Sequence, residues 1–148
     1  MAAPFLIQAI TDLLADTPAQ GKTLLDVSCK EGDVLRALVP RGFTLRGTNF
    51  EPEGPAIDAI PVDYGVDLRR PLSYADASFD VVLLVEVIEH LENHRVAIGE
   101  LARILKPGGV LILTMPNIMR LNSRMHFLFS GYHKTKRRFI PFVTPLDQ

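Results

Sequence analysis

The segment FDVVLLV at residues 79–85 predicts a strand, because it is continuous and apolar, as strands buried on both faces of a parallel sheet are. Downstream, Asn93 is a good N-cap for a helix. The apolar residues of that helix fall at helical spacing, namely Ile98, Leu101, Ala102 and Leu105. The segment KPGG at 106–109 then ends the helix with a cation, a helix stop and a permissive turn, and residues 110–115 predict the next strand.

Upstream of this stretch, helix and strand patterns alternate along the chain. Residues 4–16 repeat apolar side chains at helical spacing, and residues 23–27 form a short apolar strand pattern. A helix follows, with a buried face made of Val34, Leu35, Leu38 and Val39. Residues 43–48 alternate as a strand does, and a short strand is expected within 62–67. The alternation predicts an α/β fold: a doubly wound, mostly parallel sheet of about five strands, with helices on both faces.

Length and composition narrow the class of protein. A chain of 148 residues, 47% hydrophobic and 22% charged, suits one globular domain and excludes a disordered chain, a collagen-like chain and a disulfide scaffold. The longest apolar run, residues 81–85, is far shorter than the roughly 20 residues that cross a bilayer. The first residues lack the charge of a signal peptide, and Cys29 has no second cysteine to pair with. A cytoplasmic protein is therefore expected.

Charge is divided unevenly along the chain. Residues 1–100 hold 8 Lys and Arg against 16 Asp and Glu, whereas residues 101–148 hold 8 against one, Asp147. This split is typical either of a basic surface helix neutralised by an acidic body or of a segment with an anionic partner. Nucleic acid is not the expected partner of this segment.

Polar residues follow each predicted strand. Asp26 ends the first strand, Asn49 follows the second, Asp67 the third and Glu86 the fourth. In open α/β sheets, ligands bind beyond the carboxyl ends of the strands, near the point where the strand order reverses. These strand ends are therefore the expected position of the functional site.

Three segments resemble a known family, the class I S-adenosylmethionine-dependent methyltransferases, and most closely its type 11 branch. They are LLDVSCKEG (24–32), FDVVLLVEVIEHLEN (79–93) and ELARILKPGGVLILTMPN (100–117), and the similarity covers residues 23–117 continuously. The resemblance implies a Rossmann-like fold. It also implies methyl transfer from S-adenosylmethionine, with S-adenosylhomocysteine as product.

The resemblance implies a set of cofactor-binding residues: Asp26, Ser28, Gly32, Asn49, Asp67, Leu68 and Glu86. The family's loop after the first strand reads D-x-G-x-G-x-G, and here Ser28 and Lys30 stand at the first two glycine positions. Asn49 stands where the family has an acid that holds the ribose hydroxyls.

The remaining roles carried over from the family match this sequence more closely. Asp67 matches the acid that meets the adenine amino group, and Leu68 would lie beside the ring. Glu86 falls where the family lines the methyl-donor pocket.

No catalytic residue is assigned by the sequence. His90 is a candidate general base, but a histidine there also caps a turn in many proteins. Glu86, Glu89 and His90 share one face of a helical turn and could bind a divalent cation, although no metal is expected because this pattern is widespread in metal-free branches of the family.

The segment after residue 117 admits several interpretations. Its apolar stripe consists of Ile118, Leu121, Met125, Leu128 and Phe129. The stripe predicts a helix that either packs on the sheet or forms a lid over a small-molecule or lipid-linked acceptor, with contact to a membrane surface. The resemblance implies two further strands after the one at 110–115, but residues 139–143 predict only an edge strand or an extended tail. Three alternatives stay open: a fragment of a longer protein, a reduced relative, or a homodimer through the edge of the strand at 110–115.

The predicted organisation is one methyltransferase-like domain over residues 1–148. It has an N-terminal helix in 1–22, a cofactor-binding core in 23–117, and a basic helix and tail in 118–148. The alternative to an enzyme is a catalytically silent module that binds a partner protein or an anionic surface through residues 118–143.

Overall fold

The computed structural model describes residues 3–117 and 121–130. Its contacts divide the chain into two units, Met1–Met115 and Pro116–Gln148, and each unit is described by itself. The second contains one described helix, α4 (Leu121–Ser130). The prediction of one domain over residues 1–148 therefore stays a prediction.

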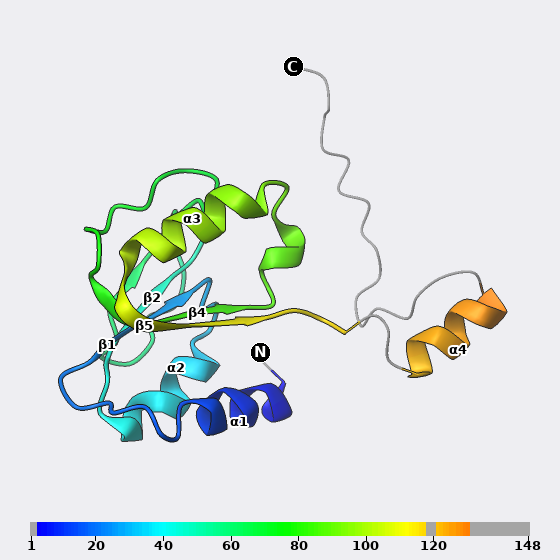
Figure 1. Cartoon of the computed structure of the whole chain (residues 1–148), viewed down its shortest axis with the longest axis horizontal. Coiled ribbons are helices and arrows are strands. Elements are labelled where there is room, and N and C mark those ends of the chain that lie inside the picture. Colours follow the sequence, from blue (N-terminus) through cyan, green and yellow to red (C-terminus); the bar gives the residue numbers. More distant parts are fainter. Residues whose placement is uncertain (1–2, 118–120, 131–148) are drawn as a thin grey trace, which may run out of the picture. The chain divides into compact units, whose positions relative to one another are not determined.

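The first unit is built on a parallel five-stranded sheet, as the sequence predicts (Figure 1). The strands lie in the order β3-β2-β1-β4-β5. The strands are β1 (Thr23–Val27), β2 (Thr44–Thr48), β3 (Val62–Asp63), β4 (Phe79–Val85) and β5 (Leu105–Thr114). The order reverses between β1 and β4, so the carboxyl ends of these two strands form the switch point of the sheet.

Helices cover both faces of the sheet, as predicted. Helices α1 (Pro4–Leu13) and α2 (Asp33–Leu38) pack on one face and α3 (His94–Ile104) on the other (Figure 1). Two single turns, η1 (Val39–Arg41) and η2 (Ile88–His90), complete the elements of this unit.

Alternation along the strands explains the two hydrophobic layers. Leu24 and Val81 belong to the layer with α1 and α2, whereas Leu25 and Val82 belong to the layer with α3. Successive side chains of a strand point to opposite faces, so an unbroken apolar strand supplies both layers.

Several predicted boundaries are wrong by a few residues. Helix α1 ends at Leu13 rather than at 16, and β2 begins at Thr44 rather than at 43, whereas β3 (Val62–Asp63) is the short strand expected within 62–67. The Asn93 cap is confirmed, because its side chain accepts a hydrogen bond from the Val96 N–H at 3.3 Å.

The largest difference lies where α3 meets β5. The strand begins at Leu105, directly after the helix, and the predicted turn at 106–109 lies inside it. Leu105 pairs with Phe79 but Val110 pairs with Val81, so the residues between them bulge out of the ladder. The predicted helix at the C-terminus runs from Leu121 to Ser130, while residues 118–120 and the strand or tail at 139–143 lie outside the described residues.

Candidate functional site

The loop after β1 is held in a left-handed backbone conformation at three positions. The φ angles are +65° at Ser28, +54° at Lys30 and +79° at Gly32. These are the positions at which the family has glycines, and this backbone costs side-chain-bearing residues roughly 1–2 kcal/mol each. The loop therefore keeps a left-handed backbone at all three positions, although only Gly32 is a glycine.

Gly32 is required for a second reason. A Cβ at this position would come within 2.4 Å of Cγ2 of Ile57, which is itself fully buried. The close approach packs the segment around Ile57 against the start of α2. No pattern in the sequence marks Ile57 as part of this arrangement.

Asp26 is the most unusual polar group of the site. It lies in β1 and is 2% exposed, and its Oδ1 is a buried side-chain oxygen without a hydrogen-bond partner among the described residues. Burial raises the pKa of this carboxyl to about 7, and the positive charge of Lys30 opposes the shift. A buried carboxylate oxygen with no donor is costly, so this atom suits a ligand that brings a donor.

Thr48, the last residue of β2, and Asn49, which follows it, hold the loop after β1 by hydrogen bonds. The Ser28 N–H donates to Oγ1 of Thr48 at 3.2 Å, and the Cys29 N–H donates to the Thr48 carbonyl at 2.9 Å. Lys30 and Asn49 exchange two hydrogen bonds, from the Lys30 N–H to Oδ1 (2.7 Å) and from Nδ2 to the Lys30 carbonyl (3.0 Å). Burial raises the pKa of the Cys29 thiol to about 12, which makes this cysteine a packing residue rather than a nucleophile.

Asp67 and Leu68 follow β3, but their surroundings differ from the expectation. Both oxygens of Asp67 accept hydrogen bonds from the Arg69 guanidinium at 2.9–3.2 Å, and these bonds hold the pKa of Asp67 below its usual range. Leu68 is 7% exposed and belongs to the hydrophobic layer on the α3 face. An adenine amino group would therefore share Asp67 with Arg69.

Two features near Asp67 could not be predicted from the sequence: a contact between Phe50 and Arg69, and a pocket. Phe50 directly follows Asn49, is 60% exposed, and has the Arg69 guanidinium 5.9 Å from its ring centroid. Asp67 also borders a pocket of about 470 Å³, in whose wall Arg46 and Asp63 form a two-bond ion pair at 2.7 and 2.8 Å. The sequence carries no signal for either feature, because both depend on which loops the sheet brings together.

The segment after β4 lies at the same edge of the sheet. Glu86 has a φ angle of +51°, and its N–H donates to the carbonyl and to Oγ1 of Thr114 at 3.1 Å. Glu89 pairs with His90 (Oε1 to Nε2, 3.8 Å). Within the part of the chain that the structure describes, no three His, Cys, Asp or Glu side chains gather in a way that could hold a metal ion.

Comparison with known proteins agrees with this geometry. A family model described as a methyltransferase domain matches residues 2–147. The 2-methyl-6-phytyl-1,4-hydroquinone methyltransferase of Synechocystis is 38% identical over 105 residues, and the ubiquinone biosynthesis O-methyltransferase of Paramagnetospirillum magneticum is 35% identical over 102. These alignments cover 66% and 64% of this chain, but only 33% and 41% of the two relatives.

A solved structure shares the fold over a greater part of the chain. The S-adenosylmethionine-dependent methyltransferase of Archaeoglobus fulgidus superimposes with a TM-score of 0.68 at 18% identity, covering 93% of this chain and 64% of that one. The chain therefore belongs to the methyltransferase-domain family, among the class I methyltransferases of the type 11 kind.

Proposed function

We propose that this chain binds S-adenosylmethionine and takes part in methyl transfer to a small-molecule acceptor. The observation that carries the proposal is Oδ1 of Asp26, which lies buried at the switch point beside a left-handed loop and has no hydrogen-bond partner in residues 3–117 and 121–130. When bound, S-adenosylmethionine supplies an activated methyl group on a sulfonium, so the protein has mainly to align the two reactants.

The residues present fit this cofactor. The ammonium of its methionine portion would donate to Asp26, which satisfies the oxygen that has no partner. Ser28 and Gly32 would line the same portion through the loop after β1, and Glu86 would border the methyl-donor pocket after β4. On the adenosine side, Asp67 would accept from the adenine amino group.

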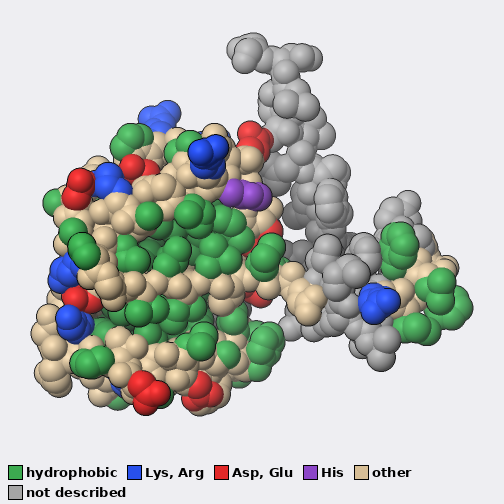
Figure 2. Space-filling model, in the orientation of Figure 1, with side chains coloured by type: hydrophobic (Ala, Val, Ile, Leu, Met, Phe, Trp, Pro, Cys, Tyr) green, Lys and Arg blue, Asp and Glu red, His purple; other side chains and the backbone are tan. Residues whose placement is uncertain are grey.

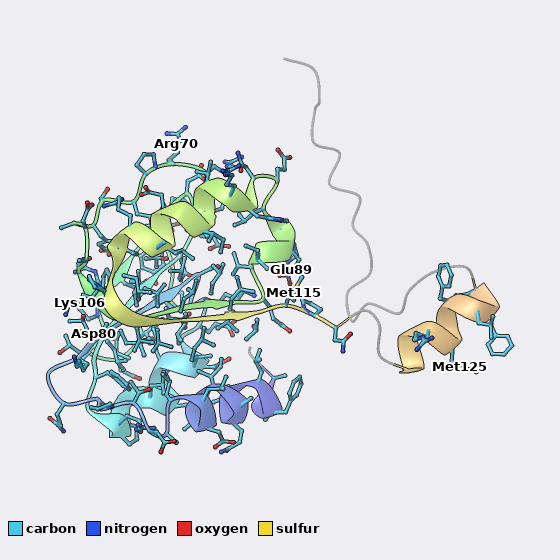
Figure 3. All side chains as sticks on the ribbon, viewed as in Figure 1. Arg70, Asp80, Glu89, Lys106, Met115 and Met125 are labelled. Carbon is cyan, nitrogen blue, oxygen red and sulfur yellow. The ribbon has the colours of Figure 1, made fainter. Side chains whose placement is uncertain are left out.

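The relatives' names support an acceptor of the quinol type with a lipid tail. Helix α4 agrees with such a substrate, since Met125, Phe127, Leu128 and Phe129 are 45–81% exposed and Arg124 lies on the same helix. Figure 2 shows hydrophobic and basic side chains on this helix, and Figure 3 labels Met125. Residues 101–148 carry a net charge of +7. Apolar and basic side chains together favour contact with an anionic membrane surface, where a lipid-linked acceptor would be found.

None of the helices in residues 3–117 and 121–130 has the length and apolar character needed to cross a bilayer. Vesicles containing anionic lipid are expected to sediment this chain, and replacing Phe127 and Phe129 with Ser is expected to abolish the effect.

The alternative of a catalytically silent module that acts through residues 118–143 has less support. Both relatives described above are named as methyltransferases. The altered loop, which motivates the alternative, keeps the left-handed backbone that glycines would otherwise provide.

Calorimetric titration with S-adenosylhomocysteine tests the proposal. Binding by the wild type is expected, with a large loss in Asp26→Asn and in Asp67→Ala. Asp12→Asn makes the same chemical change as Asp26→Asn on the exposed side of α1 and is expected to leave binding unchanged. No binding by folded wild-type protein would overturn the proposal.

A further inference from the structure

Asn49 has a different environment from the one expected of a ribose-binding residue. Its side-chain amide is committed to the backbone of Lys30, donating at 3.0 Å and accepting at 2.7 Å, and the residue is only 4% exposed. The two bonds close a ring between one side chain and one residue of the loop after β1.

This reciprocal pair requires an amide. A carboxylate has only acceptors, so an aspartate at position 49 would accept from the Lys30 N–H but would direct its second oxygen at the Lys30 carbonyl. Like Ser28 in the same loop, Lys30 has a positive φ angle, +54°, which an L-residue rarely adopts without support. The amide therefore stabilises a backbone conformation that glycine would adopt unaided.

Backbone hydrogen bonds of Asn49 connect the loop after β1 to the end of β3 and to the segment that follows it. The Asn49 N–H donates to the Asp63 carbonyl at 2.9 Å, and its carbonyl accepts from the Val66 N–H at 2.9 Å. The loop after β1, the end of β3 and the segment leading to Asp67 thus meet at one residue.

We propose that Asn49 is a positioning residue: its amide clamps Lys30 in the left-handed conformation and so keeps the loop after β1 in the shape that receives the cofactor. The inference rests on the proposed function for its effect on cofactor binding. It replaces the expectation that this side chain chiefly holds the ribose.

The two roles predict opposite effects of Asn49→Asp. A charged acceptor that contacts the ribose would tighten binding, because charge-assisted hydrogen bonds are the stronger ones. The clamp predicts weaker binding of S-adenosylhomocysteine, by about tenfold, since one bond is lost and two oxygens are brought together. Glycine at position 30 can adopt other backbone conformations, so in Lys30→Gly the peptide can turn its carbonyl away from the new carboxylate. Asn49→Asp in that background is therefore expected to change the Kd by less than about threefold.

The experiment is a double-mutant cycle of wild type, N49D, K30G and N49D/K30G, with two measurements on each protein. Calorimetry gives the Kd for S-adenosylhomocysteine, and urea unfolding without ligand gives the midpoint. Asn93→Asp is the matched control, because either residue caps a helix well. The midpoint is expected to fall in N49D and to recover in N49D/K30G.

Tighter binding by N49D, or an equal loss in both backgrounds, would overturn the inference. If N49D alone does not fold, a folded N49D/K30G supports the clamp and an unfolded one contradicts it. If the wild type binds no S-adenosylhomocysteine, the proposed function fails, but coupling between positions 49 and 30 in the urea midpoints still decides whether the clamp exists.

Discussion

At the scale of single residues, a glycine can be required because its φ angle is positive or because a side chain would not fit. Gly32 and Gly65 allow the two causes to be measured separately. Gly32 and Gly65 both have positive φ, +79° and +71°, but only a Cβ at Gly32 would meet a neighbour, Ile57 at 2.4 Å. Gly65→Ala is expected to lower the free energy of unfolding by about 1 kcal/mol. Gly32→Ala should cost about 2–4 kcal/mol, because overpacking against Ile57 adds to the backbone strain.

Urea unfolding of the two variants checks this prediction. The difference between them measures the steric contribution alone. Equal losses would mean that Ile57 moves aside, and that Gly32 is required only for its backbone conformation.

Asp26 makes a prediction about pH. Its folded pKa of about 7 lies above the ordinary value of 3.8, so the folded state keeps a proton that the unfolded state has lost. The stability of the ligand-free protein should therefore fall as pH rises from about 4 to about 7, by roughly 2–4 kcal/mol relative to Asp26→Asn. Urea unfolding at pH 5 and pH 8 tests this, and parallel trends in the two proteins would refute it.

Cofactor binding should show the opposite dependence on pH. The carboxylate form of Asp26 is the one that pairs with an ammonium, so affinity for S-adenosylhomocysteine is expected to rise as pH passes through about 7. Asp26→Asn should flatten this rise. Calorimetry across the same pH range measures it, and a pH-independent Kd in the wild type would contradict the assigned role.

At the scale of elements, Asp80 links three strands at the amino end of the sheet. Its carboxylate accepts from Lys22 (3.0 Å), from Lys106 (2.7 Å) and from the Thr23 N–H (3.0 Å). In Figure 3, Asp80 and Lys106 lie together at the end of the sheet opposite Glu89 and Met115. Burial opposes the ionised form, but these donors hold the pKa of Asp80 below its usual range.

Asp80→Ala is therefore expected to destabilise the fold without touching the site. A loss of about 1–3 kcal/mol follows from the bonds removed, discounted because both lysines are more than a third exposed. Since the folded pKa is depressed, this contribution is present at neutral pH and is lost in acid. Affinity for S-adenosylhomocysteine should be unchanged, and a large change would show that the two ends of the sheet are coupled.

The same cluster explains why the junction of α3 and β5 differs from the prediction. The segment at 106–109 has the composition of a turn, yet Lys106 bonds to Asp80. At Gly109 a Cβ would come within 2.9 Å of the Asp80 carbonyl. A strand with a bulge allows Lys106 to bond to Asp80 and allows the backbone of Gly109 to approach the Asp80 carbonyl closely. The glycine turn is thus present as the bulge, with a φ angle of +76° at Gly108, while the flanking residues pair as one strand.

At the scale of the whole molecule, β5 is the edge strand of the sheet. Among the described residues it pairs only with β4, and Val110 and Leu113 are each 38% exposed on it. Figure 2 shows apolar side chains above and below this part of the surface. Lys106, Pro107 and the bulge protect the first part of this strand, but residues 110–114 carry no charge, and an apolar edge of this kind tends to pair with another strand.

We therefore expect the chain to self-associate through β5. Light scattering after size-exclusion chromatography should show a mass that rises with concentration, and Leu113→Lys should return it to the monomer. Gln8→Lys adds the same charge on α1 and is the control. A monomer at all concentrations would contradict self-association through β5.

Much of the fold was determined by the sequence alone. Continuous apolar strands and helices with one apolar face allow few arrangements, because each must bury its apolar surface on a neighbour. The parallel sheet, the helices on both faces and the strand-end position of Asp26, Asn49, Asp67 and Glu86 follow from that pattern. The ends of elements did not follow, since single capping and turn residues compete with tertiary contacts.

Only the tertiary structure decided what these polar residues touch. The identity of Asn49 does not show that its amide serves Lys30, nor does the identity of Asp67 show that Arg69 occupies it. Arg69 is close to Asp67 in the chain, but Asn49 and Lys30 belong to segments far apart in it, as do Gly32 and Ile57. Packing of such segments also leaves Oδ1 of Asp26 without a partner among the described residues. Sequence patterns report which face a residue takes, whereas hydrogen-bond partners depend on the distances that packing of the whole sheet sets.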